Sequence, residues 1–328
     1  MSFTIEPGSL VTLLGPSGCG KTTTLRLVAG LEMLTKGRVL IGDTDVSKLP
    51  ATQRDVSMVF QSYALFPHMT VLENVAYGLV VSGQPKPEAY QAAEEGLKQV
   101  GLGGYGARLP SELSGGQQQR VAVARALVLE PQVLLFDEPL SNLDAKLRRR
   151  VREEIRELQK SLGLTTIYVT HDQEEALAVS DRIIVMNEAV IAQEGSPRDL
   201  YEVPADRFVA DFIGDANLVS GEIESVDNGL AVVNVGGAEL RLPHRDLSAG
   251  PVDLAMRPES ILLAVEPDAD AISGTITKTI YLGSRVEYLV DTPLGELFVV
   301  DGRVEKPIPP ETEVSIRLAE HGVTLVPG

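Results

Sequence analysis

The sequence is poor in cysteine, tryptophan and positive charge, and each shortage narrows what the protein can be. Its 328 residues include one cysteine and no tryptophan. Because a single cysteine has no partner within the chain, an intramolecular disulfide framework is excluded and a reducing compartment is favoured. Lysine and arginine total 29 against 46 aspartate and glutamate residues, for a net charge of −17. This acidity argues against a protein that binds nucleic acid through charge.

Long hydrophobic runs are missing as well. No stretch approaches the ~18 uninterrupted apolar residues that predict a membrane-spanning helix. The N-terminal residues show no basic segment followed by a long apolar run, so no secretory signal is predicted. Hydrophobic residues make up 44% of the chain and charged residues 23%, which is typical of a globular protein. The length suits two domains.

The negative charge is unevenly spread along the chain. Residues 1–213 carry 21 basic and 27 acidic side chains (21 − 27 = −6), whereas residues 214–328 carry 8 and 19 (8 − 19 = −11). The shorter segment therefore holds the larger surplus, which predicts a domain boundary near residue 214.

The hydrophobic pattern differs between the two parts. Before residue 214, apolar strand candidates alternate with helical segments, a pattern typical of a parallel sheet covered by helices and hence of an α/β fold. The strand candidates are the runs at 10–14, 39–41, 56–60, 133–136, 165–170 and 183–186. Helical signals dominate from about residue 70 to 130 and predict a helical subdomain there. A weakly alternating segment at residues 2–5 predicts an additional early strand. After residue 214, short β-rich runs separated by turns predict a small barrel or sandwich. These runs lie at 221–226, 231–235, 239–242, 252–256, 272–278, 285–291, 296–300 and 313–318.

The sequence from Gly15 to Thr22 matches the phosphate-binding pattern G-x-x-x-x-G-K-[ST]. Its glycines let the backbone wrap around a polyphosphate, and the helix that follows adds a favourable dipole. Lys21 is expected to reach the β- and γ-phosphates, and the Thr22 hydroxyl to ligate Mg²⁺. Cys19, within this loop, is interpreted as a small residue and not as a redox sensor.

A second group of candidates follows the apolar run at residues 133–136, which ends in Asp137 and Glu138. Taken alone, two carboxylates at a strand end are a weak signal. Beside a phosphate loop, Asp137 can hold Mg²⁺ and Glu138 can orient and polarise an attacking water.

A third group lies at residues 113–120, where Ser114, Gly115 and Gly116 precede an expected helix. They would form a second anion-binding helix N-terminus, for which an ordinary helix cap is the alternative interpretation. One nucleotide does not need two such sites in one subunit. Two subunits packed head to tail would use both sites, because each subunit contributes this loop to the phosphates bound by the other.

Together with Gln61, Asp144 and His171, these segments resemble, in type and order, the ATP-binding cassette (ABC) family. The resemblance implies a Q-loop glutamine at Gln61, a D-loop aspartate at Asp144 on the dimer seam and a switch histidine at His171 that contacts the γ-phosphate. It implies catalytic roles for Lys21, Gln61, Glu138 and His171, and Mg²⁺ contacts from Thr22, Gln61 and Asp137. The predicted nucleotide contacts are Gly15, Pro16, Ser17, Gly18, Cys19, Gly20, Lys21, Thr22 and Thr23, with Ser114, Gly115, Gly116, Gln117 and Asp144.

The resemblance extends over nearly the whole chain. Residues 195–202 and 207–214 look like the joint after the cassette in maltose-, polyamine- and iron(III)-type importer ATPases. Residues 254–259 and 281–284 look like the transport-associated OB domain of that group. Residues 61–67, with the stretch up to Asn74, resemble the groove that receives a short helix of the permease, although its apolar members could simply be core. Relatives usually carry more residues before the phosphate loop, so we expect the front edge of the cassette to be truncated.

The basic run from Arg148 to Arg150, with Arg152, could indicate nucleic-acid binding. Glutamates are interleaved with it on one amphipathic helix, and Arg149–Glu153 and Arg150–Glu154 stand four residues apart. We therefore interpret the run as a solvated face with ion pairs.

The sequence thus predicts a P-loop ABC cassette at 1–213, with a helical subdomain, followed by an all-β OB-like regulatory domain at 214–328. We expect an ATP- and Mg²⁺-dependent ATPase that forms a homodimer, drives two transmembrane permease subunits and lies at the cytoplasmic face of the inner membrane. An external solute-binding protein would be an indirect partner. The expected cargo is iron(III), with polyamine, phosphonate, and sugar or glycerol phosphate as alternatives. A soluble ABC ATPase of DNA repair or translation is disfavoured because no coiled-coil insertion, second cassette or basic arm is present.

Overall fold

The computed structural model describes residues 1–268, 271–319 and 321–327. The chain forms two compact units, Met1–Pro197 and Arg198–Gly328. This division lies ahead of the boundary that charge and strand pattern predict near residue 214. The helices between the two positions, α7 (Pro197–Glu202) and α8 (Arg207–Phe212), account for the difference, because α8 contacts strands of the second unit.

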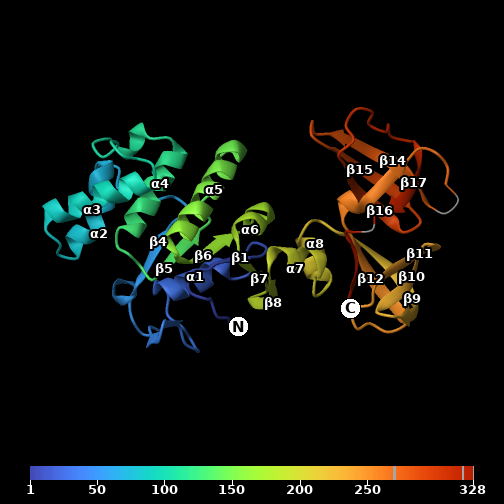
Figure 1. Ribbon diagram of the computed structural model, residues 1–328, viewed down its shortest axis with the longest axis horizontal. Helices are drawn as coiled ribbons and strands as arrows, with labels where there is room; N and C mark the ends of the chain where they lie inside the picture. Colours follow the sequence, from blue (N-terminus) through green and yellow to red (C-terminus); the bar gives the residue numbers. More distant parts are fainter. Residues whose placement is uncertain (269–270, 320, 328) are drawn as a thin grey trace. The chain divides into compact units, whose positions relative to one another are not determined.

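The first unit, which is described in full, is built on a six-stranded sheet in the order β4-β5-β6-β1-β7-β8 (Figure 1). All neighbouring pairs are parallel except β7 and β8. The strands of this sheet are β1 (Leu10–Leu14), β4 (Val56–Val59), β5 (Val133–Asp137), β6 (Thr165–Thr170), β7 (Arg182–Asn187) and β8 (Val190–Gly195), and β2 (Leu40–Ile41) pairs separately with β3 (Thr44–Asp45). The helices are α1 (Lys21–Ala29), α2 (Val71–Val81), α3 (Lys86–Gln99), α4 (Gly115–Leu127), α5 (Ala145–Leu162) and α6 (Gln173–Val179). The α/β prediction is confirmed.

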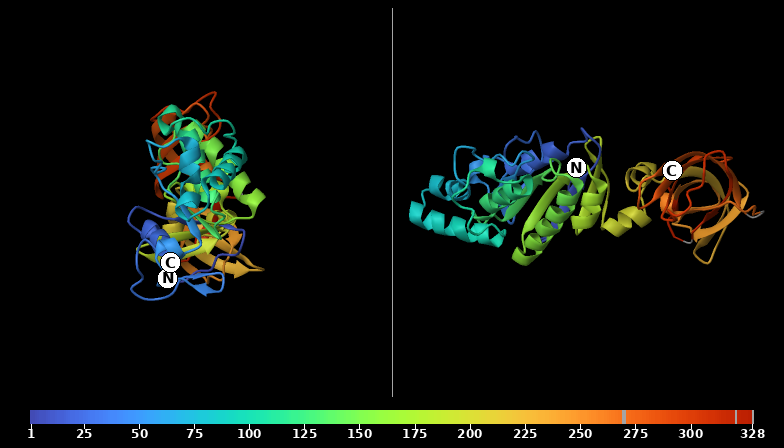
Figure 2. Two further views of the ribbon diagram at one scale, coloured as in Figure 1. Left: turned by 90° about the vertical axis from the view of Figure 1, so that its left-hand side faces the viewer. Right: turned by 90° about the horizontal axis from the view of Figure 1, so that it is seen from above.

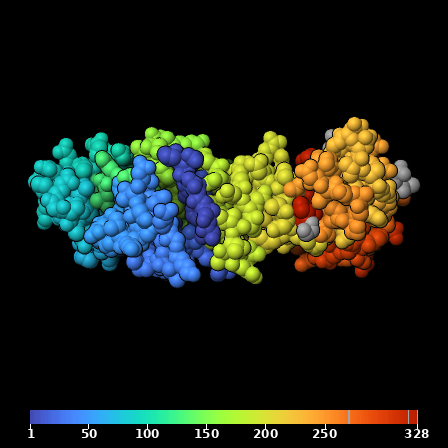
Figure 3. All heavy atoms as spheres, turned by 90° about the horizontal axis from the view of Figure 1, so that it is seen from below, coloured from blue at the N-terminus to red at the C-terminus, as the bar shows by residue number. Residues whose placement is uncertain are grey.

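The prediction of a strand at residues 2–5 is wrong. β1 already has β6 on one side and β7 on the other, so no free edge is left beside it for a further strand. The opening segment, dark blue in Figure 3, instead lies on the surface of the unit. Arg182 donates a hydrogen bond to the carbonyl oxygen of Thr4, and the side chains of Phe3 and Ile5 pack against the core beneath the sheet.

Helices α2, α3 and α4 lie together at one end of the first unit (Figure 1). α2 begins with a capping box, in which Thr70 Oγ1 accepts from the Glu73 amide at 3.2 Å and Glu73 Oε2 accepts from the Thr70 amide at 2.8 Å. Such caps satisfy the amides that a helix N-terminus leaves without partners. Small and branched apolar side chains of the three helices share one buried cluster with Phe136 and Tyr168 of the sheet. The cluster therefore joins the helical part to the sheet.

Helix α5 combines one buried stripe with one exposed charged face. Val151 and Ile155 are buried, and Asp144 caps the first turn by accepting from the Leu147 amide at 3.0 Å. Both predicted ion pairs are confirmed, with nitrogen–oxygen distances of 3.7 Å for Arg149–Glu153 and 3.2 Å for Arg150–Glu154.

The second unit is β-rich, as predicted. Its described strands form two five-stranded antiparallel sheets, ordered β11-β10-β9-β12-β18 and β13-β17-β14-β15-β16. The right-hand view of Figure 2 shows them curving around a common interior, which confirms the OB-like class. The strands are β9 (Asn217–Asp227), β10 (Leu230–Val235), β11 (Ala238–Pro243), β12 (Gly250–Met256), β13 (Ile261–Ala264), β14 (Ile272–Tyr281), β15 (Val286–Thr292), β16 (Gly295–Asp301), β17 (Glu313–Leu318) and β18 (Val323–Val326).

Two polar residues fasten this second unit internally. The Asn217 side chain bonds the backbone of Phe298 in both directions, at 2.7 and 2.8 Å, and so bridges the two sheets. Arg257 is 1% exposed and donates to carbonyl oxygens of Tyr201, Ala210 and Ile213. Burial lowers the pKa of Arg257 to about 10, which still leaves its guanidinium charged at neutral pH. The carbonyls thus satisfy a buried cation and hold α7 and α8 on the barrel.

Over the described ranges 1–268, 271–319 and 321–327, every helix is too short or too polar to cross a membrane.

Candidate functional site

The predicted site residues gather at one edge of the parallel sheet. The phosphate loop follows β1, Gln61 follows β4, Asp137 and Glu138 end β5, and His171 follows β6. β4, β5, β6 and β1 are consecutive neighbours and run parallel. Their carboxyl ends therefore meet at the edge where open α/β sheets bind ligands.

The phosphate loop is closed around the side chain of Lys21. Its ammonium donates to the carbonyl oxygens of Gly15 at 2.7 Å and Pro16 at 2.9 Å, and only 5% of the residue is exposed. Gly15 is required sterically, because a Cβ there would lie 2.2 Å from the carbonyl oxygen of Met186. The lysine ammonium is thus oriented by carbonyl dipoles of the loop itself.

The other loop residues divide into exposed and buried positions. Ser17, Gly18 and Thr23 are exposed, whereas Cys19 is 3% exposed. Gly18 and Gly20 have φ values of 81° and 97°. The Cys19 side chain belongs to the core cluster beneath the sheet and lies 3.7 Å from the Lys21 ammonium, in keeping with its interpretation as a small packing residue.

Thr22 and Asp137 provide the oxygen atoms expected of a magnesium site. The Thr22 hydroxyl donates to Asp137 Oδ1 at 3.4 Å. Burial, and then the neighbouring charge of Glu138, raise the pKa of Asp137 above its ordinary value. A cation here would offset both effects, and a hydroxyl beside a carboxylate suits Mg²⁺, which usually keeps several waters. The donors present therefore fit the ion.

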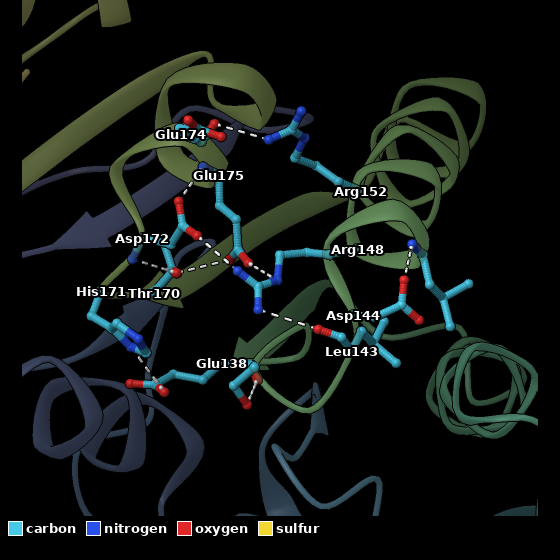
Figure 4. A network of polar contacts seen from close by, with 12 residues as sticks. Glu138, Leu143, Asp144, Arg148, Arg152, Thr170, His171, Asp172, Glu174 and Glu175 are labelled. Atoms are coloured by element: carbon cyan, nitrogen blue, oxygen red, sulfur yellow. Dashed lines mark hydrogen bonds and ion pairs between the residues drawn. The ribbon is translucent and has the colours of Figure 1, made fainter. Parts of the chain in front are cut away.

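Glu138 and His171 are in direct contact, with 3.2 Å between Glu138 Oε2 and His171 Nδ1 (Figure 4). Glu138 has a φ of 46°, in the left-handed region, which costs a side-chain-bearing residue about 1–2 kcal/mol. Its amide donates to the Val169 carbonyl at 3.0 Å, and its own carbonyl accepts from Ser141 Oγ at 3.0 Å. These bonds hold a strained backbone that aims the carboxylate at His171, as is common at functional sites.

Gln61 is exposed. Its carbonyl oxygen accepts from Asn142 Nδ2 at 2.9 Å, which links the segment after β4 to the loop before α5. Just beyond, Arg125 donates to the carbonyls of Tyr63 and Ala64 at 2.9 and 2.7 Å. The Gln61 segment is therefore anchored through its backbone, while the amide side chain stays at the surface.

Ser114 is exposed at the start of α4, and its amide donates to Gln117 Oε1 at 2.9 Å. The two glycines after it pack against the loop before α5 and its first turn. A Cβ at Gly115 would lie 3.2 Å from Leu143 Cδ2, and one at Gly116 would lie 2.9 Å from Leu147 Cδ1. The predicted signature loop and the Asp144 loop are thus in contact within one subunit.

Sequence reasoning missed three polar residues that support the site. Asn142 holds the Gln61 carbonyl. Arg148 and Glu175 link the Asp144 loop to the segment around His171 (Figure 4). Arg148 was grouped with the solvated arginine run, because spacing alone does not separate a half-buried arginine from its exposed neighbours.

Comparison with known proteins agrees with this geometry. The family model described as "ABC transporter" matches residues 1–141, and the model described as "TOBE domain" matches residues 254–325. The chain is 64% identical to the "Fe(3+) ions import ATP-binding protein FbpC" of Brucella abortus (strain 2308) over 327 residues, which cover 99% of this chain and 92% of that protein. The protein of the same name from Vibrio cholerae is 52% identical over 293 residues, covering 88% and 82%.

Among solved structures, the chain resembles a dimeric ATP-binding cassette in a post-hydrolysis state with ADP and Pi bound. The match has a TM-score of 0.53 and 33% sequence identity, and it covers 60% of this chain and 88% of the other. With a phosphate loop, paired carboxylates and a contacting histidine at one sheet edge, and with relatives this similar over nearly their full length, the chain belongs to the ABC transporter family as an ATP-hydrolysing cassette with a C-terminal TOBE domain.

Proposed function

We propose that this chain is the energy-coupling ATPase of an importer whose cargo is iron(III). It would work as a homodimer on two transmembrane permease subunits at the cytoplasmic face of the inner membrane, with an external solute-binding protein as an indirect partner. The observation that carries the ATPase assignment is the contact between Glu138 and His171 beside Lys21, Thr22 and Asp137. The names of the relatives support the cargo.

Each residue of the site has a separate role in ATP hydrolysis. Lys21 neutralises charge on the β- and γ-phosphates, and the Glu138 carboxylate accepts a proton from the attacking water. His171 holds Glu138 and contacts the γ-phosphate, and Gln61 orients the water. Thr22, Asp137 and Gln61 would hold Mg²⁺, which would supply positive charge to offset that of the phosphates. The second copy contributes Ser114, Gly115, Gly116, Gln117 and Asp144 across the seam, where the exposed start of α4 can donate amides to phosphate oxygens.

For the domain organisation, we propose that nucleotide chemistry is confined to residues 1–213 and regulation to residues 214–328, with α7 and α8 as the joint. The permease groove would lie along residues 61–74, beside Tyr77. In this stretch the Phe66 and Tyr77 rings lie 4.6 Å apart, and Tyr77 is 40% exposed. Exposed aromatic surface of this kind suits a short amphipathic helix.

The Glu138→Gln substitution tests the catalytic assignment. The amide cannot accept the proton, so we expect ATP hydrolysis to fall about 10²- to 10⁴-fold, while ATP still binds and a closed dimer accumulates. Phosphate release and size-exclusion chromatography with ATP measure the two effects. Glu153→Gln on the exposed face of α5 is the matched control and should hydrolyse ATP like the unaltered protein. Near-normal phosphate release by Glu138→Gln would refute the role of general base.

The cargo is tested by uptake in cells that lack the gene. Iron(III) uptake should be lost, restored by the unaltered gene, and not restored by Glu138→Gln. If the deletion spares iron(III) uptake and removes uptake of a polyamine, a phosphonate, or a sugar or glycerol phosphate, the cargo belongs to that class instead.

A further inference from the structure

Arg148 occupies the space between the two loops that flank Glu138 (Figure 4). Its Nη2 donates to the carbonyl oxygen of Leu143 at 3.2 Å, and its Nη1 donates to Asp172 Oδ2 at 3.2 Å. Its Nε lies 3.8 Å from Glu175 Oε1, an ionic contact longer than a hydrogen bond. One side chain therefore contacts the residue before Asp144 and the residue after His171.

The partners of Arg148 are themselves fixed around His171. Thr170 Oγ1 donates to Glu175 Oε2 at 2.8 Å and accepts from the Asp172 amide at 3.0 Å. Asp172 Oδ1 accepts from the Glu175 amide at 3.0 Å and caps α6. Both chain neighbours of His171 thus belong to one bonded network, and His171 extends from it to Glu138.

Burial distinguishes this network from the ion pair of the neighbouring Arg149. The Glu175 side chain is 4% exposed and that of Arg148 33%, whereas that of Arg149 is 77% exposed. A guanidinium is planar and rigid, so hydrogen bonds from its two Nη atoms can hold two acceptors at a fixed distance and angle from each other. Exposed pairs such as Arg149–Glu153 hold nothing of this kind.

We propose that Arg148 is a positioning residue that couples the Asp144 loop to His171. A displacement of the Asp144 loop would carry the Leu143 carbonyl and the guanidinium with it and, through Asp172, change where His171 stands relative to Glu138. Arg148 itself touches neither ATP nor water in this scheme. The inference rests on the proposed function, because it assigns to Arg148 an effect only through His171.

The first test compares Arg148→Met with Arg149→Met. The methionine keeps most of the aliphatic volume and removes the fork, so we expect kcat to fall about 10- to 100-fold, as for a misplaced catalytic group. The KM for ATP should change by less than about twofold, because ground-state binding is untouched. Arg149→Met should leave both constants unchanged. Circular dichroism verifies that both variants are folded.

The second test repeats Arg148→Met in a His171→Ala background. If Arg148 acts through His171, the second substitution should lower kcat by no more than about twofold further. If Arg148 had a purely structural role, the fold-decreases in kcat caused by the two substitutions would instead multiply in the double variant. Glu175→Gln is the milder variant if Arg148→Met does not fold. It can still accept from Thr170 and Tyr168 but loses the charge facing Arg148, and it should show the same pattern of reduced kcat and constant KM.

The outcomes separate this inference from the proposed function. An impaired His171→Ala protein with multiplicative losses in the double variant would overturn the coupling role alone. A raised KM in Arg148→Met, or an equal effect of Arg149→Met, would do the same. A His171→Ala protein that hydrolyses ATP normally would overturn the role of His171 and the coupling with it.

Discussion

Individual charged residues in this protein act mainly through fixed hydrogen-bond partners. Asp181 shows this outside the catalytic site. It pairs with Arg156, with 2.9 Å between Arg156 Nη1 and Asp181 Oδ2, and it accepts from the Leu10 amide at 2.8 Å. The hydrogen bond from Arg156 lowers the pKa of Asp181, burial raises it, and the hydrogen bond from the Leu10 amide lowers it again. The net effect is a pKa below 3.8. One carboxylate thereby joins α5, β1 and the start of β7.

Asp181→Asn should weaken the first unit in a pH-dependent way. Because the folded-state pKa is depressed, the ionised carboxylate stabilises the fold above pH 3.8 and loses that effect as the pH falls through the folded-state pKa. The difference in unfolding temperature between the unaltered protein and the variant should be constant near pH 7 and shrink below about pH 4. Calorimetry measures it, since the chain has no tryptophan to report unfolding. A difference that grows on acidification would contradict the assignment.

The contact between α4 and α5 depends on a glycine for steric reasons. Gly116 faces Leu147, and an added Cβ would lie 2.9 Å from Leu147 Cδ1. A side chain added at Gly116 would require the Leu147 side chain to move away from its present position. The same helix N-terminus stays exposed at Ser114.

Gly116→Ala should therefore destabilise the helix pair. Because the clash involves the end of one flexible leucine side chain, the cost should lie near the lower end of the about 1–3 kcal/mol typical of overpacking, and calorimetry would register it as a lower unfolding temperature. The cost should be smaller in a Leu147→Ala background, where the space is open. Gly302→Ala, where an added Cβ would meet nothing within 4 Å and φ lies outside the left-handed region, is the control and should change stability little. If Gly116→Ala loses as much stability with Leu147 as without it, the steric reason is wrong.

The molecule as a whole has separate hydrophobic cores in its two units. One set of clusters lies around the parallel sheet and its helices, and another lies between the two sheets of the barrel. The acidic surplus of residues 214–328 belongs to the barrel side. The acidity that argued against nucleic acid is therefore not a property of the phosphate site, which relies on Lys21 and backbone dipoles.

Separate cores predict two calorimetric transitions in the full chain. ATP with Mg²⁺ should raise only one of them, because a ligand stabilises the unit it binds by about 2.7 kcal/mol at a hundredfold excess over Kd. Glu138→Gln is the form to use, since turnover would otherwise consume the ligand. A single transition that moves as one with ATP would contradict independent units.

Local patterns predicted the cassette strands well, and the failures share a cause. The runs at 10–14 and 165–170 became β1 and β6 with those bounds. The segment at residues 2–5 has strand-like alternation but no free edge to pair with. The sequence analysis missed β8 in the cassette and β13 and β18 in the barrel, although each pairs with another strand. Strand formation depends on partners far along the chain, which periodicity does not report.

The sequence by itself determined the chemistry of the site. A loop that wraps phosphate, carboxylates after a buried strand and a histidine after the next one are local features, and each carries its physical requirement within a few residues. The tertiary structure alone decided which side chains support them. Arg148 differs from Arg149 only in the direction each faces on α5. Because of that direction, Arg148 contacts two loops and the buried Glu175, whereas Arg149 lies exposed to water.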